Sequence, residues 1–309
     1  MSRPTRNSVA GRAYLDLQNR ARREKRGTQE LLTMYVVERW LARLSRSAYA
    51  ENFVLKGGML LASFGNRRPT VDADALARNM NADQQTVAAR VVAVAAVADP
   101  DDGVEFLTDT ITTQLIRGDA LYAGVRVVMG ARLATAQVKL RLDVNFGDPV
   151  TPEPRLVELP ALRPGVEPIC VLGYPLETVL AEKITTAIDL GLANTRVRDF
   201  ADVFTLTGNH SLSCGTMRAA LAATATFRGV ELRPLAVAVS GLDALRASTY
   251  TAYKRSLGEA GSALPERFQE AIDAAVAFID PVITGLAEDA RWEHGPRRWS
   301  TPGQTLSSS

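Results

Sequence analysis

The stretch that decides the fold reads Phe53-Val-Leu-Lys-Gly-Gly-Met-Leu-Leu-Ala-Ser-Phe-Gly-Asn-Arg-Arg-Pro-Thr-Val-Asp-Ala-Asp74. A short apolar strand ends in Gly57-Gly58, a helical run follows, and a basic loop leads to a second strand that carries Asp72 and Asp74. A Gly-Gly turn that opens a helix leaves backbone N–H groups uncovered, and such groups bind phosphate oxygens. Residues i and i+2 of a strand share a face, so the two carboxylates lie about 7 Å apart and suit a divalent cation such as Mg²⁺. A phosphate cradle beside metal-binding carboxylates indicates nucleotidyl transfer.

The clearest strand pattern covers residues 138–146, where apolar and polar side chains alternate over nine residues. The alternation puts Asp143 on the polar face of this strand. If the strand lies beside the one that carries Asp72 and Asp74, Asp143 becomes a third metal ligand. The alternative is a surface charge paired with Arg141 or Lys139.

Two further motifs follow in order, Tyr174-Pro-Leu-Glu-Thr-Val-Leu-Ala-Glu-Lys183 and Asn194-Thr-Arg-Val-Arg-Asp-Phe-Ala-Asp202. With the first stretch they make roughly residues 30–285 resemble the AbiEii/MenT branch of the polymerase-β-like nucleotidyltransferases, the toxin halves of bacterial toxin–antitoxin systems. The resemblance implies a bi-lobed α+β fold, with a mixed sheet in the N-terminal lobe and a helical C-terminal lobe.

The same resemblance assigns roles to residues of this chain. The metal ligands are Asp72, Asp74 and Asp143. The catalytic residues are Asp72, Asp74, Lys183 and Asp202. The nucleotide is held by Lys56, Gly57, Gly58, Arg68, Thr70, Lys183, Arg196 and Asp199.

Some of these residues have alternative structural roles, and the sequence departs from the family pattern at a few positions. Lys183 is otherwise a solvated charge, and Asp199 and Asp202 are otherwise structural ion-pair partners. Met59 stands where many relatives have Ser or Thr after Gly-Gly, and Ala73 and Ala75 replace larger aliphatic residues. These changes remove no metal ligand.

By resemblance, the chain is a Mg²⁺-dependent nucleotidyltransferase that moves NMP from NTP to an RNA acceptor. The acceptor is the 3′ end of tRNA, where added nucleotides block aminoacylation and translation, and a cognate antitoxin is the expected protein partner. A protein or small-molecule acceptor is the first alternative. A catalytically silent nucleotide-binding module is the second.

Composition narrows the class of protein further. In 309 residues, 46% hydrophobic and 23% charged, no apolar run is long enough for a membrane span and no signal peptide is visible. Two cysteines and two histidines argue against a disulfide framework and a zinc site. We therefore expect a soluble, cytoplasmic monomer.

Charge is uneven along the chain. The first 26 residues hold eight basic and two acidic side chains, a net charge of +6, so the rest carries −4 in a chain whose net charge is +2. A basic arm of this kind is typical of nucleic-acid contact, although a solvated amphipathic helix has the same composition.

The organisation predicted along the chain has three parts. An N-terminal lobe with a basic helical arm covers residues 1–160, a helical lobe covers 161–298, and a disordered tail covers 299–309. Residues 12–46 carry one helical apolar period, and the Pro-rich segment 149–168 is expected to connect the lobes.

Overall fold

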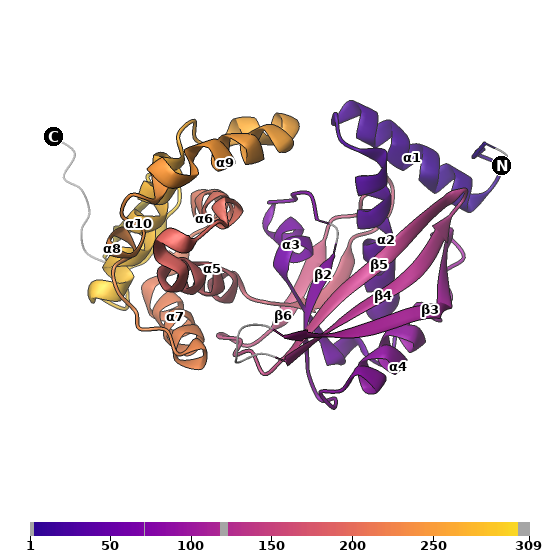
Figure 1. Ribbon diagram of the computed structural model, residues 1–309, viewed down its shortest axis with the longest axis horizontal. Coiled ribbons are helices and arrows are strands. Elements are labelled where there is room, and N and C mark those ends of the chain that lie inside the picture. Colours follow the sequence, from indigo (N-terminus) through magenta and orange to yellow (C-terminus); the bar gives the residue numbers. More distant parts are fainter. Residues whose placement is uncertain (1–2, 71, 118–122, 302–309) are drawn as a thin grey trace. The chain divides into compact units, whose positions relative to one another are not determined.

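The computed structural model describes residues 3–70, 72–117 and 123–301 (Figure 1). The chain forms two compact units. Unit 1 contains residues 1–148 and 154–174, and unit 2 contains residues 149–153 and 175–309.

Unit 1 is built on a seven-stranded mixed sheet with the order β3-β4-β5-β2-β1-β7-β6. Its strands are β1 (Phe53–Lys56), β2 (Ala73–Ala77), β3 (Val104–Arg117), β4 (Ala123–Leu133), β5 (Ala136–Phe146), β6 (Arg155–Leu159) and β7 (Ile169–Gly173). Its helices are α1 (Val9–Arg23), α2 (Thr28–Leu44), the short α3 (Gly57–Leu60) and α4 (Gln84–Ala95), with 3-10 turns at Ala50–Asn52 and Leu61–Phe64. Strands β3, β4 and β5 form an antiparallel meander, whereas β2 runs parallel to β5 and antiparallel to β1.

Helices α1, α2 and α4 pack on one face of the meander, and Figure 1 shows β3, β4 and β5 in front of α2 and α4. The alternation in β5 explains this layer, because its apolar side chains at 138, 140, 142 and 144 are all buried. They pack beneath α2, whose Trp40 ring meets the Phe53 ring edge-on at 5.6 Å. Burial of such apolar surface is the main stabilising term of the unit.

The helical period predicted over residues 12–46 is two helices rather than one. Helix α1 begins at the N-cap Ser8, whose hydroxyl accepts a hydrogen bond from the Gly11 N–H at 3.0 Å. It stops before Lys25, which has a left-handed backbone with φ of 54°, and Gly27 then caps α2. A left-handed residue breaks the helical hydrogen-bond ladder, so apolar periodicity could continue across the break while the helix did not.

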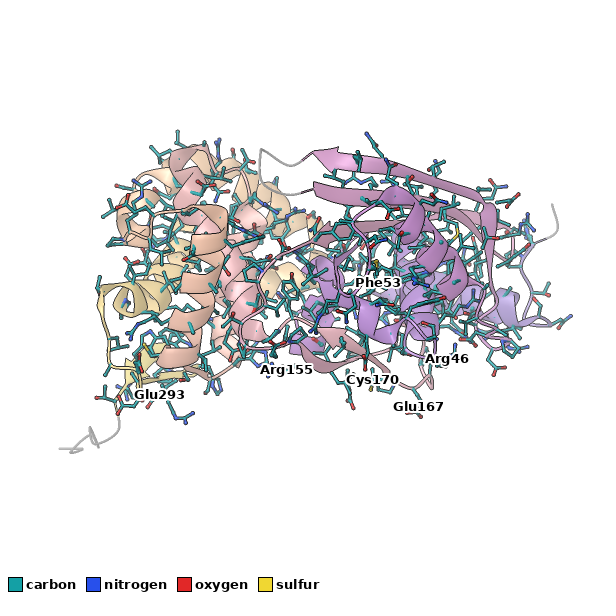
Figure 2. All side chains as sticks on the ribbon, turned by 90° about the horizontal axis from the view of Figure 1, so that it is seen from below. Arg46, Phe53, Arg155, Glu167, Cys170 and Glu293 are labelled. Carbon is teal, nitrogen blue, oxygen red and sulfur yellow. The ribbon has the colours of Figure 1, made fainter. Side chains whose placement is uncertain are left out.

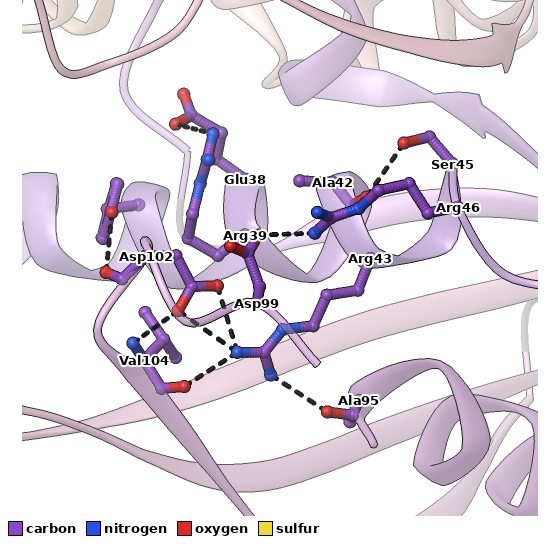
Figure 3. Close-up of polar contacts among 11 residues, drawn as sticks. Glu38, Arg39, Ala42, Arg43, Ser45, Arg46, Ala95, Asp99, Asp102 and Val104 are labelled. Atoms are coloured by element: carbon purple, nitrogen blue, oxygen red, sulfur yellow. Dashed lines mark hydrogen bonds and ion pairs between the residues drawn. The ribbon is translucent and has the colours of Figure 1, made fainter. Parts of the chain in front are cut away.

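A buried charge network ties α2 to the loop before β3 (Figure 3). The Arg43 guanidinium contacts both carboxylate oxygens of Asp102 at 3.1 and 3.2 Å and donates to the carbonyl oxygens of Ala95 and Val104. Burial raises the pKa of Asp102 even though Arg43 and the Val104 N–H lower it. The network therefore fixes geometry at a desolvation cost, as buried ion pairs commonly do.

Unit 2 is mainly helical. Its helices are α5 (Leu176–Leu190), α6 (Val197–Asn209), α7 (Cys214–Arg228), the short α8 (Leu235–Ala238), α9 (Leu242–Ser256) and α10 (Phe268–Thr284), with 3-10 turns at Gly191–Ala193 and Gly258–Ala263. A small sheet of β8 (Leu212–Ser213), β9 (Arg291–Glu293) and β10 (Arg298–Ser300) has the order β10-β9-β8. The Phe278 ring stacks on Trp299 at 5.6 Å and meets Trp292 edge-on at 5.1 Å, so the small sheet is packed against α10.

Three predictions about organisation differ from the structure. The boundary lies between Tyr174 and Pro175 rather than at residue 160, because β6 and β7 belong to the sheet of unit 1. For the same reason the segment 149–168 is more than a connector, and Arg155 on β6 and Cys170 on β7 are exposed at this edge (Figure 2). The predicted tail begins too early, since Trp299 and Ser300 are in β10, and its residues 302–309 lie outside the described part.

Among the described residues, none of the helices combines the length and apolar character that a membrane span requires.

Candidate active site

A row of four charged residues crosses the polar face of the unit 1 sheet. The strand register pairs Lys56 of β1 with Asp74 of β2, Asp74 with Asp143 of β5, and Asp143 with Arg126 of β4. Paired residues of neighbouring strands share a face and lie about 5 Å apart. The strand that carries Asp143 therefore lies beside the strand that carries Asp74, which is the arrangement that the metal-ligand hypothesis requires. The role of Asp143 as a metal ligand stays a prediction.

The Gly57-Gly58 turn lies directly against this row. Gly57 has a φ of +67°, and a Cβ atom there would lie 1.9 Å from Asp74 Oδ2. A Cβ atom on Gly58 would lie 2.8 Å from the Thr70 hydroxyl oxygen and 3.6 Å from Arg68 Nη1. Only glycine fits both the backbone angle and the space at residue 57, so the turn and the Asp74 carboxylate form one packed unit.

Thr70 connects the basic loop to the first aspartate. Its hydroxyl donates to the backbone carbonyl oxygen of Asp72 at 3.1 Å and lies 3.2 Å from Asp72 Oδ1. Asp72 precedes β2, and both it and Asp74 are partly exposed. The loop thus holds Asp72 by a local turn that is typical of Thr and Asp.

Asp143 is engaged by the arginine beside it. Arg126 donates from Nε and Nη2 to the two carboxylate oxygens at 2.8 and 2.6 Å. These hydrogen bonds and the charge of Asp143 raise the pKa of Arg126, and the charges of Asp72 and Asp74 act in the same direction. Arg126 is therefore the counter-ion of the acidic end of the row. Neither Arg141 nor Lys139, the partners considered for Asp143 in the sequence, takes this place.

The second predicted cluster lies in unit 2, on α5 and α6. Lys183 Nζ is 2.7 Å from Asp199 Oδ1 and 2.8 Å from Asp202 Oδ2. Arg196 Nε is 3.0 Å from the other oxygen of Asp199. The Asn194 side chain accepts a hydrogen bond from the Arg196 N–H at 2.7 Å, which forms a local turn just before α6, and Arg196 is the N-cap of that helix. The motif residues thus assemble one compact ion-pair cluster.

Electrostatics favour the charged form of Asp199. Burial alone would raise the pKa of Asp199, but the charges of Lys183 and Arg196 outweigh it and hold the pKa below its usual value. Asp202 is almost fully buried, with 2% of its side chain exposed, and Lys183 retains 13%. From the sequence alone we expect Asp199 to brace the neighbouring arginines and Asp202 to orient either Lys183 or a substrate hydroxyl. In the structure both aspartates contact Lys183, and Asp199 also contacts Arg196.

The AbiEii family model, described as the nucleotidyl transferase AbiEii toxin of type IV toxin–antitoxin systems, matches residues 39–277. The chain belongs to this family. The match includes every residue of the charged row and of the Lys183 cluster. No curated protein matches this AbiEii-family chain in sequence.

Two solved structures are similar to this AbiEii-family member. MenT4, a nucleotidyltransferase toxin from Mycobacterium tuberculosis H37Rv, is 17% identical over 87% of this chain and 98% of its own, with a TM-score of 0.50. JHP933 from Helicobacter pylori is 15% identical over 73% of this chain and 95% of its own, with a TM-score of 0.40. The likeness to MenT4 concerns the fold, a mixed α/β nucleotidyltransferase toxin fold.

The carboxylates of the AbiEii-family site fit a divalent metal in part. Asp72 and Asp74 supply the hard oxygen donors that Mg²⁺ prefers, and Gly57 leaves the Asp74 carboxylate the space it occupies. In the described chain, however, no three His, Cys, Asp or Glu side chains form a group that could hold a metal ion. Asp143, the third predicted ligand, has both carboxylate oxygens hydrogen-bonded to Arg126, so they face a cation of the chain itself.

Lys56 has surroundings that the sequence did not reveal. Its ammonium is 2.5 Å from Asp148 Oδ2 and 5.2 Å from the centre of the Tyr174 ring, and the Tyr174 hydroxyl donates to the same Asp148 oxygen at 3.4 Å. Asp148 was missed because Gly147-Asp148-Pro149 resembles an ordinary turn. Its place two residues after β5 was the signal available.

Proposed function

We propose that this chain transfers NMP from an NTP to the 3′ end of an RNA, with tRNA as the acceptor. The observation that supports the proposal most is the seat of the Asp74 carboxylate on the Gly57-Gly58 turn, beside Asp143 and two residues after Asp72, in a member of a nucleotidyl transferase family. The turn offers backbone N–H groups to a triphosphate, and the register places Asp74 and Asp143 side by side on one face of the sheet. The added nucleotide would block aminoacylation and so translation in the cytoplasm.

The proposed roles follow from the donors present. Asp72 and Asp74 would hold Mg²⁺, and Asp143 would join them when Arg126 turns to the phosphates. The metal, when bound, neutralises the developing negative charge on the phosphates. The acceptor 3′ hydroxyl oxygen would form a bond to the α-phosphorus and lose its proton to water, while the bond from that phosphorus to the bridging oxygen breaks and pyrophosphate leaves with the electron pair.

Nucleotide contacts complete the proposal. Gly57, Gly58, Thr70 and Arg68 would hold the triphosphate on unit 1, and Lys56 would do so after it leaves Asp148. Within unit 2, Lys183 and Arg196 are the proposed nucleotide contacts, with Asp199 and Asp202 orienting Lys183 through the observed ion pairs. A cognate antitoxin is the expected protein partner, in keeping with the type IV toxin–antitoxin family.

The test is incubation with each α-labelled NTP, Mg²⁺ and total cellular RNA, followed by separation of RNA and protein. We expect label on tRNA-sized RNA with the wild-type chain and none with Asp72→Ala or Asp74→Ala. Both variants should be folded and should have the same thermal unfolding midpoint as the wild type. Asp109→Asn, at an exposed position of β3, is the matched control and should label normally. Label on protein would favour the protein-acceptor alternative. Full labelling by either alanine variant would contradict the mechanism.

A further inference from the structure

The face of the meander opposite α1, α2 and α4 is polar and exposed. On β5 the outward side chains Gln137, Lys139 and Arg141 are exposed, whereas Val138, Leu140 and Leu142 between them are buried. Lys139 lies opposite Gly130, and Arg141 lies opposite Val128. Because Gly130 has no side chain, the stem of Lys139 has little beside it on β4. We call Gln137, Lys139 and Arg141 the β5 stripe.

The two cationic side chains of the β5 stripe, Lys139 and Arg141, have no partner among the described residues. Neither side chain makes a hydrogen bond or ion pair with any residue in the described part of the chain. Two arginines of β4 on the same face differ, because Arg126 is paired with Asp143 and Arg132 with Glu105. The stripe therefore carries positive charge that the fold does not use.

The β5 stripe continues directly into the charged row. Successive outward residues of a strand are about 7 Å apart, so Lys139, Arg141 and Asp143 follow one another in line. Asp143 is the register partner of Asp74, so the line ends at the carboxylates. On the same face of β3, which is separated from β5 by β4, Gln114 and Thr112 are exposed opposite Arg126 and Val128. The Thr112 hydroxyl donates to the Val128 carbonyl oxygen at 3.4 Å, and the Gln114 amide offers a neutral hydrogen-bond donor.

We propose that the β5 stripe binds the phosphodiester backbone of the acceptor RNA, immediately upstream of the 3′ end that receives the nucleotide. The inference rests on the proposed function and specifies where that acceptor lies. Evenly spaced cations without protein partners, flanked by neutral polar groups, suit a polyanion. A protein acceptor would favour an apolar patch, and the exposed Leu156, Leu190 and Leu245 belong to other elements. Leu115 of β3 is also exposed, but its register partner is the buried Val125, so it lies on the opposite face of the meander.

The test compares the wild-type chain with Lys139→Glu/Arg141→Glu and with Arg155→Glu as a matched control. Arg155 is an exposed arginine on β6, four strands away from β5 in the same sheet. For each full-length protein, tRNA affinity is measured against salt concentration, NTP affinity is measured without RNA, and label transfer to tRNA is recorded. A second double variant, Lys139→Gln/Arg141→Gln, removes charge without adding repulsion, and thermal unfolding checks that each variant is folded.

We expect the Glu double variant to bind tRNA at least tenfold more weakly and to lose about two from the slope of log affinity against log salt, one for each phosphate contact. The Gln variant should show a smaller loss of affinity with the same loss of slope, while NTP affinity and the Arg155→Glu control match the wild type. Wild-type tRNA affinity and slope in both folded double variants overturn the inference, even if the wild-type chain labels tRNA and the proposed function stands. If the wild-type chain labels no RNA at all, the proposed function fails, and this inference fails with it.

Discussion

Lys183 is the residue whose surroundings most change its expected behaviour. It is held by two aspartates, so it is not the solvated charge that a lone lysine beside an apolar stripe would be. Its role toward the nucleotide remains a prediction. Removing it would also leave Asp199 and Asp202 buried without their shared cation.

We therefore expect Lys183→Ala to lose on the order of tenfold to a hundredfold in kcat/KM for NTP, as the loss of one charge-assisted contact predicts. The same variant should lose about 3–5 kcal/mol of unfolding free energy, because breaking a buried pair leaves uncompensated charge. Urea unfolding and NTP kinetics on the same preparations separate the two effects. Lys254→Ala, which removes a lysine paired with the exposed Glu266, is the control and should change neither. Unchanged NTP kinetics in a folded Lys183→Ala protein would limit Lys183 to a structural role.

Asp199 gives a prediction with a defined pH window. Its pKa is lower in the folded chain than the usual value near 3.8, so its charged form stabilises the fold. That contribution is fully present above the unfolded pKa and is lost as the pH falls through the folded pKa. Wild-type protein should exceed Asp199→Asn by about 1.5–3 kcal/mol at pH 7, and the difference should shrink as the pH falls below the ordinary value of 3.8 and through the lower folded pKa. Unfolding curves at a series of pH values test this, and a difference that does not depend on pH would contradict it.

Sequence reasoning reached some site residues and not others for physical reasons. The alternation of β5 was enough to put Asp143 on the polar face, and its neighbourhood to Asp74 proved correct. The partner of Asp143 could not be predicted, because Arg126 reaches it through the β4–β5 register rather than through any local motif. Asp148, which holds Lys56, is 92 residues away from it in the chain, and such pairs leave no periodic signal.

Helix α2 is the element that organises unit 1, and its polar contacts illustrate two kinds of ion pair (Figure 3). Arg43 and Asp102 are buried, with 6% and 1% of their side chains exposed, whereas the side chain of Arg46, paired with Asp99, is 49% exposed. Arg43 is in the last turn of α2, and Arg46 lies in the turn that follows the end of this helix at Leu44. They therefore make a matched pair of sites for measuring what burial does to an ion pair.

We expect Arg43→Ala to lower the unfolding free energy by about 3–5 kcal/mol, because Asp102 stays buried without its cation. Arg46→Ala should cost less than about 1 kcal/mol, as exposed pairs usually do. Arg43→Met combined with Asp102→Leu should recover part of the loss, although the Val104 N–H then loses the Asp102 oxygen that accepts from it at 2.7 Å. Urea unfolding of the four proteins measures these differences, and equal costs at Arg43 and Arg46 would contradict the assignment.

The basic arm predicted at the N-terminus contains helix α1, which packs against the rest of unit 1. Ala13, Leu17 and Ala21 are buried, so the arm is a packed helix and not a frayed extension. Arg20 pairs with Glu24, and Arg26 pairs with Glu30. Arg20 also donates to the Leu162 carbonyl oxygen at 2.5 Å. These two arginines stabilise unit 1, which leaves the exposed Arg22 and Arg23 as candidates for contact with nucleic acid.

Across the whole molecule, charge is divided between a basic N-terminal segment and a mildly acidic remainder. If the exposed part of α1 contributes to RNA binding, it does so by releasing counterions. We expect Arg22→Glu/Arg23→Glu to weaken tRNA binding and to reduce the salt slope by about two, with NTP affinity unchanged. Affinity against salt is again the measurement. A slope equal to that of the wild type would make α1 a purely structural helix.

At the same scale, the sequence predicted the fold class and most elements, while the assembly of the sheet escaped it. Alternation and apolar runs mark β1, β2 and β5 locally. The membership of β6 and β7 depends on the parallel contact between Leu55 and Gly173, which no local pattern reports. Proline-rich sequence around β6 suggested a linker, because proline is compatible with both a linker and an edge strand.

The close fit of Gly57 against Asp74 bears on which mutations inactivate this protein when a cell expresses it. The backbone angle of Gly57 and the space taken by Asp74 disfavour every residue that has a Cβ atom, and any single-base change that alters the amino acid at a glycine codon would introduce a side chain there. If Asp74 holds the metal as proposed, we expect one such change to displace its carboxylate and to abolish nucleotide transfer. Colonies that survive forced expression should therefore carry replacements of Gly57 far more often than of Gly27, where a Cβ atom would meet only Glu30 at 3.8 Å. The glycine at which an added Cβ atom would lie nearest to a site carboxylate is therefore the position at which we expect inactivating replacements to accumulate.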